Sequence, residues 1–194
     1  MNPNIDYSKL CTPAEFLKAE LDMGISMFNE QFVNLCKHTA EQVSELGFKS
    51  VLDYGAGTGV YAESYRRLGY DVYAFEIWEE HKNYIRENAP QVNIVEEPVT
   101  TDLMNFIEVA EHMTDAEIIS VFSAISPKYI LFSSTSDTTE WDLAWGHINV
   151  KPQDQWVKLF ADLGYEYVKP MPYPTNYTKL FKRNESRSNL NQQD

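Results

Sequence analysis

Residues 51–59, VLDYGAGTG, hold the first group whose residue types and spacing could do chemistry. An apolar run typical of a strand leads into one acid and three glycines at alternate positions, which are Asp53, Gly55, Gly57 and Gly59. Glycine has no Cβ atom and adopts positive φ angles easily, so this backbone can turn tightly and come close to a ligand. In an open α/β sheet, ligands bind at the carboxyl ends of the strands. The segment is therefore predicted to be a binding loop.

The glycine spacing separates two kinds of nucleoside ligand. A dinucleotide fingerprint, GxGxxG, would place its third glycine at position 60, which is Val60. The third glycine comes one residue early, which disfavours a nicotinamide-binding oxidoreductase. Glu76 ends the next apolar run, and a carboxylate there can accept hydrogen bonds from both ribose hydroxyls of either kind of ligand. The alternative without a function is a glycine-rich turn beside an incidental acid.

The second group is an ExxEH motif at the end of a later apolar run, formed by Glu108, Glu111 and His112. If the chain turns helically after Glu108, these positions share one face, so that two carboxylates and an imidazole converge. Carboxylate oxygens with an imidazole suit Mg, Mn, Fe or Zn. The segment after the next apolar run supplies a further histidine, His147. The alternative is that the motif orders its loop through hydrogen bonds, without a metal.

The elements that must position these groups follow from the spacing of the apolar residues. One helix is predicted from Thr12, where Glu15 completes a capping box, and a second over 27–46, which Gly47 can end. Short apolar runs then alternate with helical stretches four times, which indicates βαβ units and a largely parallel sheet. A helix over 151–165 and two pairing strands around a proline-rich turn close the pattern. The sequence predicts an α/β fold.

The acid, the three glycines and the second strand-end acid together resemble the motifs of class I S-adenosylmethionine (SAM) dependent methyltransferases. The resemblance covers about residues 48 to 182. It implies a Rossmann-like, seven-stranded, mostly parallel sheet with an antiparallel last strand and helices on both faces. It also implies SAM as the cofactor and methyl transfer as the reaction. The residues implied to contact the cofactor are Asp53, Tyr54, Gly55, Ala56, Gly57, Gly59, Glu76, Ile77, Glu97 and Glu108. For Glu97, a solvated acidic turn is the alternative.

The ExxEH stretch is similar to that of the O-methyltransferases of ubiquinone biosynthesis and of the small-RNA 2'-O-methyltransferases, in which a divalent metal can bind. The resemblance implies Glu108, Glu111, His112 and His147 as ligands of Mg or Mn. Such an ion would lower the pKa of an acceptor hydroxyl. Without a metal, His147 is the candidate general base and His112 the second catalytic candidate. A structural histidine is the other alternative.

The charge of the chain bears on the methyl acceptor. The net charge is −13, from 29 acidic and 16 basic residues, which disfavours nucleic acid because binding to phosphates depends on Lys and Arg. We expect O-methylation of a small-molecule or glycan-like acceptor. The alternatives are a metal-dependent RNA 2'-O-methyltransferase and a non-catalytic SAM-binding module. Aromatic residues are the candidate walls of the acceptor pocket, unless they pack over the sheet edge: Tyr7, Phe16, Trp141 and Trp145.

The organisation expected is one domain. Residues 1–47 form a helical cap, 48–183 the SAM-binding part, and 184–194 a polar tail expected to be disordered. Cys11 and Cys36 form no CxxC pair and are expected to be reduced thiols. No apolar run approaches membrane length, and the N-terminus lacks a signal-peptide core. A cytoplasmic protein without a membrane partner is expected, of unknown oligomeric state.

Overall fold

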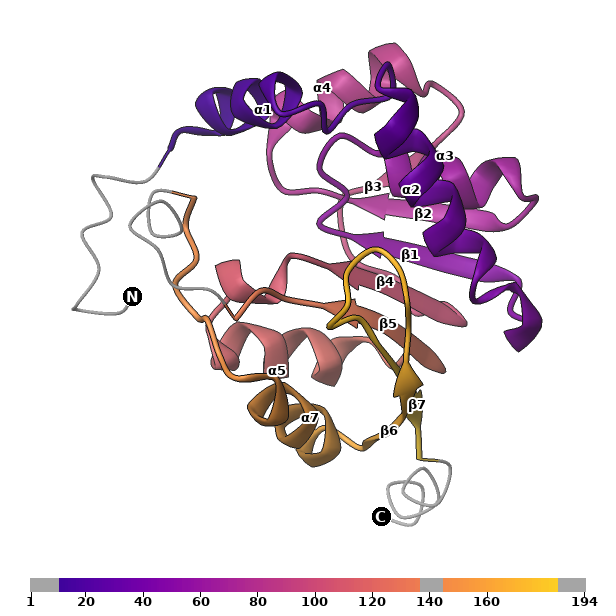
Figure 1. Ribbon diagram of the computed structural model, residues 1–194, viewed down its shortest axis with the longest axis vertical. Helices are drawn as coiled ribbons and strands as arrows, with labels where there is room; N and C mark the ends of the chain where they lie inside the picture. Colours follow the sequence, from indigo (N-terminus) through magenta and orange to yellow (C-terminus); the bar gives the residue numbers. More distant parts are fainter. Residues whose placement is uncertain (1–10, 137–144, 185–194) are drawn as a thin grey trace.

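A seven-stranded sheet forms the centre of the computed structural model, which describes residues 11–136 and 145–184. The strands are β1 (Ser50–Tyr54), β2 (Asp71–Phe75), β3 (Asn93–Val95), β4 (Leu103–Ile107), β5 (Tyr129–Ser133), β6 (Tyr165–Pro170) and β7 (Lys179–Arg183). Their order is β3-β2-β1-β4-β5-β7-β6, and β7 pairs antiparallel with both of its neighbours (Figure 1). The predicted mostly parallel sheet with an antiparallel last strand is confirmed.

Helices precede the first strand and lie in several of the connections between strands. They are α1 (Pro13–Asp22), α2 (Glu30–Glu41), α3 (Val60–Arg67), α4 (Glu79–Asn88), α5 (Asp115–Ala124) and α7 (Gln153–Asp162), with short 3-10 helices η2 (Ser44–Leu46) and η3 (Ala110–His112). The predicted capping box of α1 is confirmed, since Thr12 and Glu15 each accept from the other's backbone N–H. The predicted boundaries of the second helix, 27–46, were wrong at both ends. The side chain of Asn29 caps α2 at its start, and the chain tightens into η2 before Gly47.

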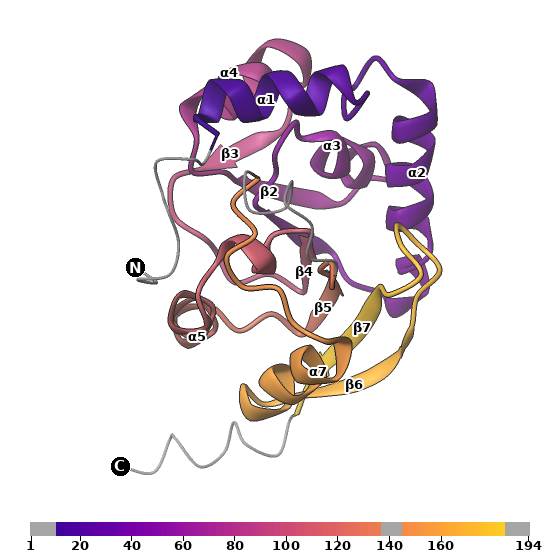
Figure 2. The ribbon, with the colours of Figure 1, turned by 60° about the vertical axis from the view of Figure 1, so that its left-hand side comes forward.

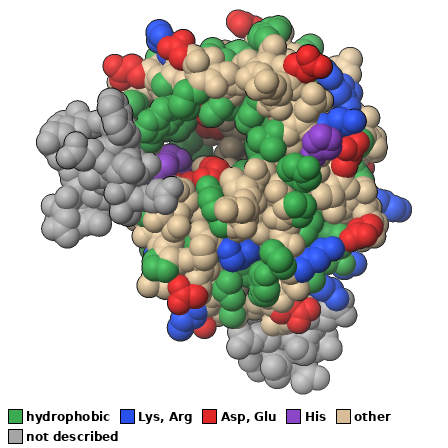
Figure 3. Space-filling model, viewed as in Figure 1, with side chains coloured by type: hydrophobic (Ala, Val, Ile, Leu, Met, Phe, Trp, Pro, Cys, Tyr) green, Lys and Arg blue, Asp and Glu red, His purple; other side chains and the backbone are tan. Residues whose placement is uncertain are grey.

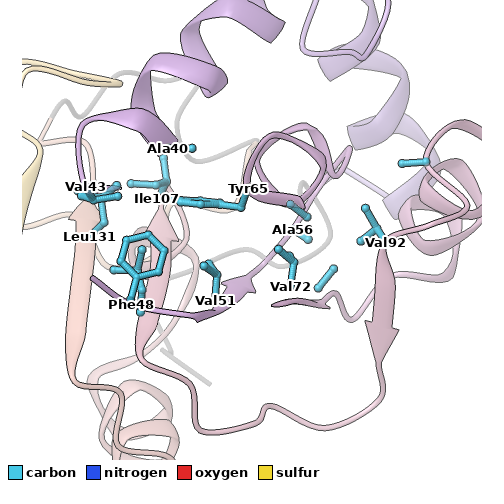
Figure 4. Close-up of a cluster of buried hydrophobic side chains, with 14 of the residues drawn as sticks. Ala40, Val43, Phe48, Val51, Ala56, Tyr65, Val72, Val92, Ile107 and Leu131 are labelled. Carbon is cyan, nitrogen blue, oxygen red and sulfur yellow. The ribbon is translucent and has the colours of Figure 1, made fainter. Parts of the chain in front are cut away.

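Two apolar cores lie on opposite faces of the sheet, because alternate residues of each strand point to opposite sides. Val51 of β1 faces the core under α2, α3 and α4, whereas its neighbour Leu52 faces the core under α5 and α7. Figure 4 shows the first core, in which the fully buried Tyr65 of α3 packs among the strand residues. Trp156 of α7 anchors the second. The predicted helices on both faces are confirmed, and Figure 2 shows the two helical layers.

The N-terminal helices take different places. Helix α1 lies beside α4 at the carboxyl ends of β1 and β2, whereas α2 packs along α3 on one face (Figures 1 and 2). Of these two helices, only α1 is therefore placed to cover a site at the strand ends. Neither Cys11 nor Cys36 is in a disulfide. Over the two described stretches of chain, no helix has the length and apolar character that crossing a membrane requires.

Candidate cofactor and active site

A cavity of about 460 Å³ opens at the carboxyl ends of β1, β2 and β4. The chain runs outward from β1 through β2 to β3 and then crosses back to β4 on the other side of β1. The cavity therefore lies at the topological switch point where α/β sheets bind ligands. Helix α1 and the start of α5 contribute the remaining walls. Figure 3 shows this face hollowed, with hydrophobic side chains around the hollow and acidic and histidine side chains at its edge.

The three glycines of the loop after β1 serve two purposes. A Cβ atom on Gly55 would lie 2.7 Å from Cγ2 of Val109, and one on Gly59 would lie 2.7 Å from Cγ1 of Ile85. These two glycines are required by packing against the protein itself. A Cβ on Gly57 would meet only Oε1 of Glu20, at 3.5 Å, and Gly57 lines the cavity. Gly55 also lines the cavity, but of these two lining glycines it is Gly57, with a φ of +52°, whose Cβ side is free for a ligand.

Glu76 holds the loops after β1 and β2 together. Its Oε2 atom accepts a hydrogen bond of 2.9 Å from the backbone N–H of Gly57. Its Oε1 atom accepts from the backbone N–H groups of Ile77 and Trp78, at 2.8 and 2.9 Å. Three backbone donors thus orient this carboxylate, which is 5% exposed, at the wall of the cavity. An acceptor fixed in this way is suited to receive hydrogen bonds from ligand hydroxyls.

Asp53 lies below the loop and is not among the residues that line the cavity. It is 2% exposed, and its Oδ1 atom accepts a hydrogen bond of 2.7 Å from the side chain of Asn105 on β4. Burial raises the pKa of Asp53 to about 7. This position suits a residue that supports the loop from beneath.

In the ExxEH motif, the first residue, Glu108, has a different backbone conformation from Glu111 and His112, which lie in η3. Glu108 has a positive φ of +53°, and its backbone N–H donates to the carbonyl of Ser133 on β5. Its carboxylate accepts from the hydroxyl of Ser133 and, at 3.3 Å, from that of Tyr177. The predicted helical turn begins only afterwards, in η3. Glu108 lines the cavity, and its carboxylate is hydrogen-bonded to side chains of β5 and of the β6–β7 connection.

A candidate metal-binding group lies next to Glu108 in the structure. It consists of Glu111, His112 and His147, each of which has one potential ligand atom within 4.8 Å of those of the other two. The rings of the two histidines lie 4.7 Å apart at 76°. Glu111 is fully buried, and neither of its oxygens has a hydrogen-bond partner within the described residues. Burial, followed by the charge of Glu108, raises its pKa well above the usual value. Burial, followed by the neighbouring His147, lowers the pKa of His112 to about 4.

These properties fit a divalent cation. A buried carboxylate without donors is costly, and a cation would compensate for it. Neutral imidazoles ligate metals without losing a proton, and His112 is neutral over the physiological range. Glu108, the fourth predicted ligand, is not in this group of three. Metal binding at Glu111, His112 and His147 stays a prediction.

Phe16 of α1 lies at the centre of an aromatic group over the cavity. Its ring contacts those of Trp78, at a centroid distance of 4.9 Å, Trp145, at 4.8 Å, and His112, at 5.9 Å. One residue of α1 thus touches the loop after β2, the ExxEH motif and the segment that bears His147. Phe16 lines the cavity, whereas Trp145 contacts the ring of Phe16 and is not itself a lining residue. Tyr7 and Trp141, the other predicted wall residues, lie outside the described residues.

Comparison with known proteins decides the family. A protein-family model for a methyltransferase domain matches residues 28–169, which is most of the chain. The chain belongs to this methyltransferase domain family. A ubiquinone biosynthesis O-methyltransferase from Acinetobacter baylyi is 30% identical over 163 residues, which are 75% of this chain and 62% of that protein. The chain thus spans less than two thirds of the length of this relative.

Solved structures show that the methyltransferase domain has the expected fold. The magnesium protoporphyrin IX methyltransferase from Synechocystis PCC 6803 with bound SAH has a TM-score of 0.62 at 15% identity, covering 78% of this chain and 83% of that one. The mitomycin 7-O-methyltransferase has a TM-score of 0.62 at 14% identity, covering 88% of this chain and 59% of that one. The Rossmann-like class I architecture predicted from the sequence is confirmed.

The predicted cofactor residues of the methyltransferase domain fall into two sets. Those that line the cavity are Tyr54, Gly55, Gly57, Glu76, Ile77 and Glu108. The others stand apart from the lining: Asp53, Ala56, Gly59 and Glu97. Glu97 is exposed two residues after β3. Its placement favours the solvated acidic turn over a contact with the cofactor.

Glu20, Trp78 and His81 are among the cavity residues of the methyltransferase domain that were not predicted from the sequence. Trp78 follows Glu76 by two positions, which was a signal that could have been used. Glu20 and His81 are 61 positions apart and meet only because α1 folds back over α4. Their proximity has no counterpart in the spacing of the sequence.

Proposed function

We propose that the chain binds SAM in the cavity and transfers its methyl group to a hydroxyl of a small-molecule or glycan-like acceptor. The observation that carries the proposal is the pairing of Gly57 with Glu76, which sets an open backbone beside an oriented carboxylate at the switch point. Membership of the methyltransferase domain family supports it. Oxygen as the methylated atom is inferred from the relative from Acinetobacter baylyi, which is an O-methyltransferase.

Each residue has a role under this proposal. The backbone at Gly57 would contact the methionine part of SAM, and Glu76 would accept hydrogen bonds from the ribose hydroxyls. Ile77, with an exposed fraction of 70%, would give apolar contact at the cavity mouth. When bound, SAM would supply a methyl group on a sulfonium, to which the acceptor oxygen bonds as the bond from methyl to sulfur breaks and S-adenosylhomocysteine leaves. Phe16 and its aromatic neighbours exclude water and hold the reacting groups in line.

The lining of the cavity favours a small acceptor over RNA. Four glutamates line it, and no Lys or Arg is among its described residues. These glutamates are Glu20, Glu76, Glu108 and Glu117. An acceptor rich in phosphates would meet repulsion here, because phosphate binding depends on cationic side chains. Uncharged hydroxyl compounds are therefore favoured.

Activation of the acceptor would fall to the second group of residues. Glu111, His112 and His147 would hold a Mg or Mn ion, which when bound lowers the pKa of a hydroxyl. Without a metal, His147 is the better candidate base, because the pKa of His112, about 4, makes that imidazole a weak base at neutral pH. The metal-dependent RNA 2'-O-methyltransferase remains the second candidate, supported by this group of residues and disfavoured by the charge.

Calorimetric titration with S-adenosylhomocysteine (SAH), the demethylated product of SAM, tests the proposal. We expect micromolar binding by the natural chain and none by Gly57→Val, with the exposed Gly69→Val as the matched control that binds normally. Absence of SAH binding by the natural chain would overturn the proposal. Binding of SAH with no turnover of SAM on any panel of hydroxyl compounds would favour the non-catalytic module. A cytoplasmic location belongs to the same proposal and is checked by cell fractionation.

A further inference from the structure

Glu20 of α1 reaches across the cavity wall to the glycine loop. Its Oε2 atom lies 2.8 Å from Nε2 of His81 on α4, so the Nε2–H tautomer of His81 donates a hydrogen bond to it. Its Oε1 atom faces the loop, 3.5 Å from the position of a Cβ on Gly57. Both Glu20 and His81 line the cavity. Glu20 is therefore the side chain that faces the Cβ side of Gly57, where the loop leaves room for a ligand.

His81 is placed to fix the orientation of that carboxylate. It is 1% exposed, and the rings of Trp78 and Phe16 pack around it at centroid distances of 5.3 and 6.0 Å. The Nδ1 atom of His81 is buried and has no hydrogen-bond partner in the described part of the chain. The imidazole is therefore held through its Nε2 atom, which bonds to Glu20. An imidazole held this way presents its donor in one direction only.

The charge around Glu20 calls for a cation. Glu76 lies close enough that its charge, after burial, raises the pKa of Glu20. No Lys or Arg is found among the described lining residues, so no permanently cationic side chain of the lining offsets the two carboxylates. A ligand group that is cationic and donates hydrogen bonds would satisfy Oε1 of Glu20 and relieve the repulsion.

We propose that Glu20, oriented by His81, binds the α-ammonium group at the methionine end of SAM. The inference rests on the proposed function, under which that end of the cofactor lies against the backbone of Gly57. Its consequence is selectivity. The cavity distinguishes a cofactor that keeps its amino acid from an adenosine thioether that lacks it.

A pair of ligands isolates the contact. SAH carries the amino acid, whereas methylthioadenosine has the same nucleoside and sulfur without it. We expect Glu20→Gln to weaken SAH roughly tenfold or more and to leave methylthioadenosine unchanged, because a charge-assisted hydrogen bond is lost for SAH alone. His81→Asn should weaken SAH in the same selective way but less. The matched control is Asp22→Asn, an exposed carboxylate on the same helix, which should bind both ligands normally.

The outcomes separate the two proposals. Equal SAH affinity in Glu20→Gln and in the natural chain overturns the contact but not the proposed function. Equal loss of both ligands also overturns it, because Glu20 would then act on the nucleoside or on the docking of α1. Binding of neither ligand by the natural chain overturns the proposed function and this inference with it. Thermal unfolding of each variant shows whether it folds. If Glu20→Gln does not fold, the same comparison of the two ligands is made with His81→Asn, which keeps the carboxylate.

Discussion

The backbone N–H of Gly57 donates a 2.9 Å hydrogen bond to Oε2 of Glu76, and this bond joins the loop after β1 to the loop after β2. Ile77 and Trp78 donate to the other oxygen, so the carboxylate faces three N–H groups. An amide at this place would turn a donor toward a donor. The geometry of the cavity therefore depends on having an acceptor-only carboxylate side chain at position 76 rather than an amide.

Glu76→Gln should lower both stability and cofactor affinity. We expect a loss of roughly 1 to 3 kcal/mol in the free energy of unfolding and at least a tenfold loss in SAH affinity. Chemical denaturation and calorimetry measure the two effects. Glu79→Gln, at an exposed carboxylate that pairs with Arg86 on the same helix, is the matched control and should change neither. A Glu76→Gln protein that binds SAH like the natural chain would contradict the assignment.

Substitutions of the glycines should separate packing from ligand access. Gly55→Ala places a methyl group 2.7 Å from Val109 in addition to the strain of its positive φ, and should cost roughly 2 to 3 kcal/mol of stability. Gly57→Ala and Gly69→Ala meet no such clash and should each cost about 1 kcal/mol. Of the last two, only Gly57→Ala should lose SAH binding. Similar SAH affinity in both variants would mean that the cofactor does not approach Gly57.

Asp53 should make stability depend on pH. Its pKa is raised to about 7 in the folded protein, whereas an unfolded aspartate has a pKa of about 3.9. The folded state therefore binds more protons between these values, so this contribution is complete below pH ~4 and is lost as the pH rises through ~7. Between pH 4 and 8, we expect the free energy of unfolding to fall by roughly 2 to 4 kcal/mol less in Asp53→Asn than in the natural chain. Denaturation curves at several pH values check this.

The control for Asp53 is another aspartate of the same sheet. Asp71 is exposed at the start of β2, and Asp71→Asn should show the same pH dependence as the natural chain. The slopes are the quantity to compare, because an asparagine at position 53 also buries a new donor. Parallel slopes for Asp53→Asn and the natural chain would mean that Asp53 is ionised in the folded protein at lower pH.

Metal binding should depend on Glu111. If a divalent cation binds the native group of Glu111, His112 and His147, Mn should raise the melting temperature of the natural chain, since a ligand that binds only the folded state stabilises it. Glu111→Gln should abolish the rise, and Glu87→Gln, at an exposed position of α4, should keep it. No rise in the EDTA-treated natural chain on adding Mn or Mg would favour the metal-free alternative, in which the motif orders its loop.

Phe16 should hold α1 over the cavity. Its ring contacts Trp78 and Trp145, and α1 itself contains no fully buried residue. We expect Phe16→Ala to speed hydrogen exchange of α1 roughly tenfold or more, because removal of buried aromatic contacts costs at least 1 to 2 kcal/mol. Phe28→Ala, at a phenylalanine that is 79% exposed, is the matched control and should leave exchange unchanged. Unchanged exchange in Phe16→Ala would show that other contacts hold α1.

The order of the elements could be predicted because it depends on local pattern. Strand and helix periodicities, the capping box at Thr12 and the pairing of the last two strands are all visible over short stretches of chain. The boundaries of α2 were missed because the cap at Asn29 and the tightening into η2 compete with the apolar period that continues past both ends. Periodicity predicts the presence of a helix better than its ends.

By itself, the sequence determined that a glycine loop follows the first strand and that an acid follows the second, because both depend on residues close together in the chain. Only the tertiary structure decided that a Cβ would have room at Gly57 but not at Gly55 or Gly59, since the clashes come from Val109 and Ile85. It likewise placed the carboxylate of Glu108 against Ser133 of β5 and beside Glu111, and brought Glu20 to His81. Such contacts join residues far apart in sequence, and their geometry is set by how helices and strands pack, which residue spacing does not encode.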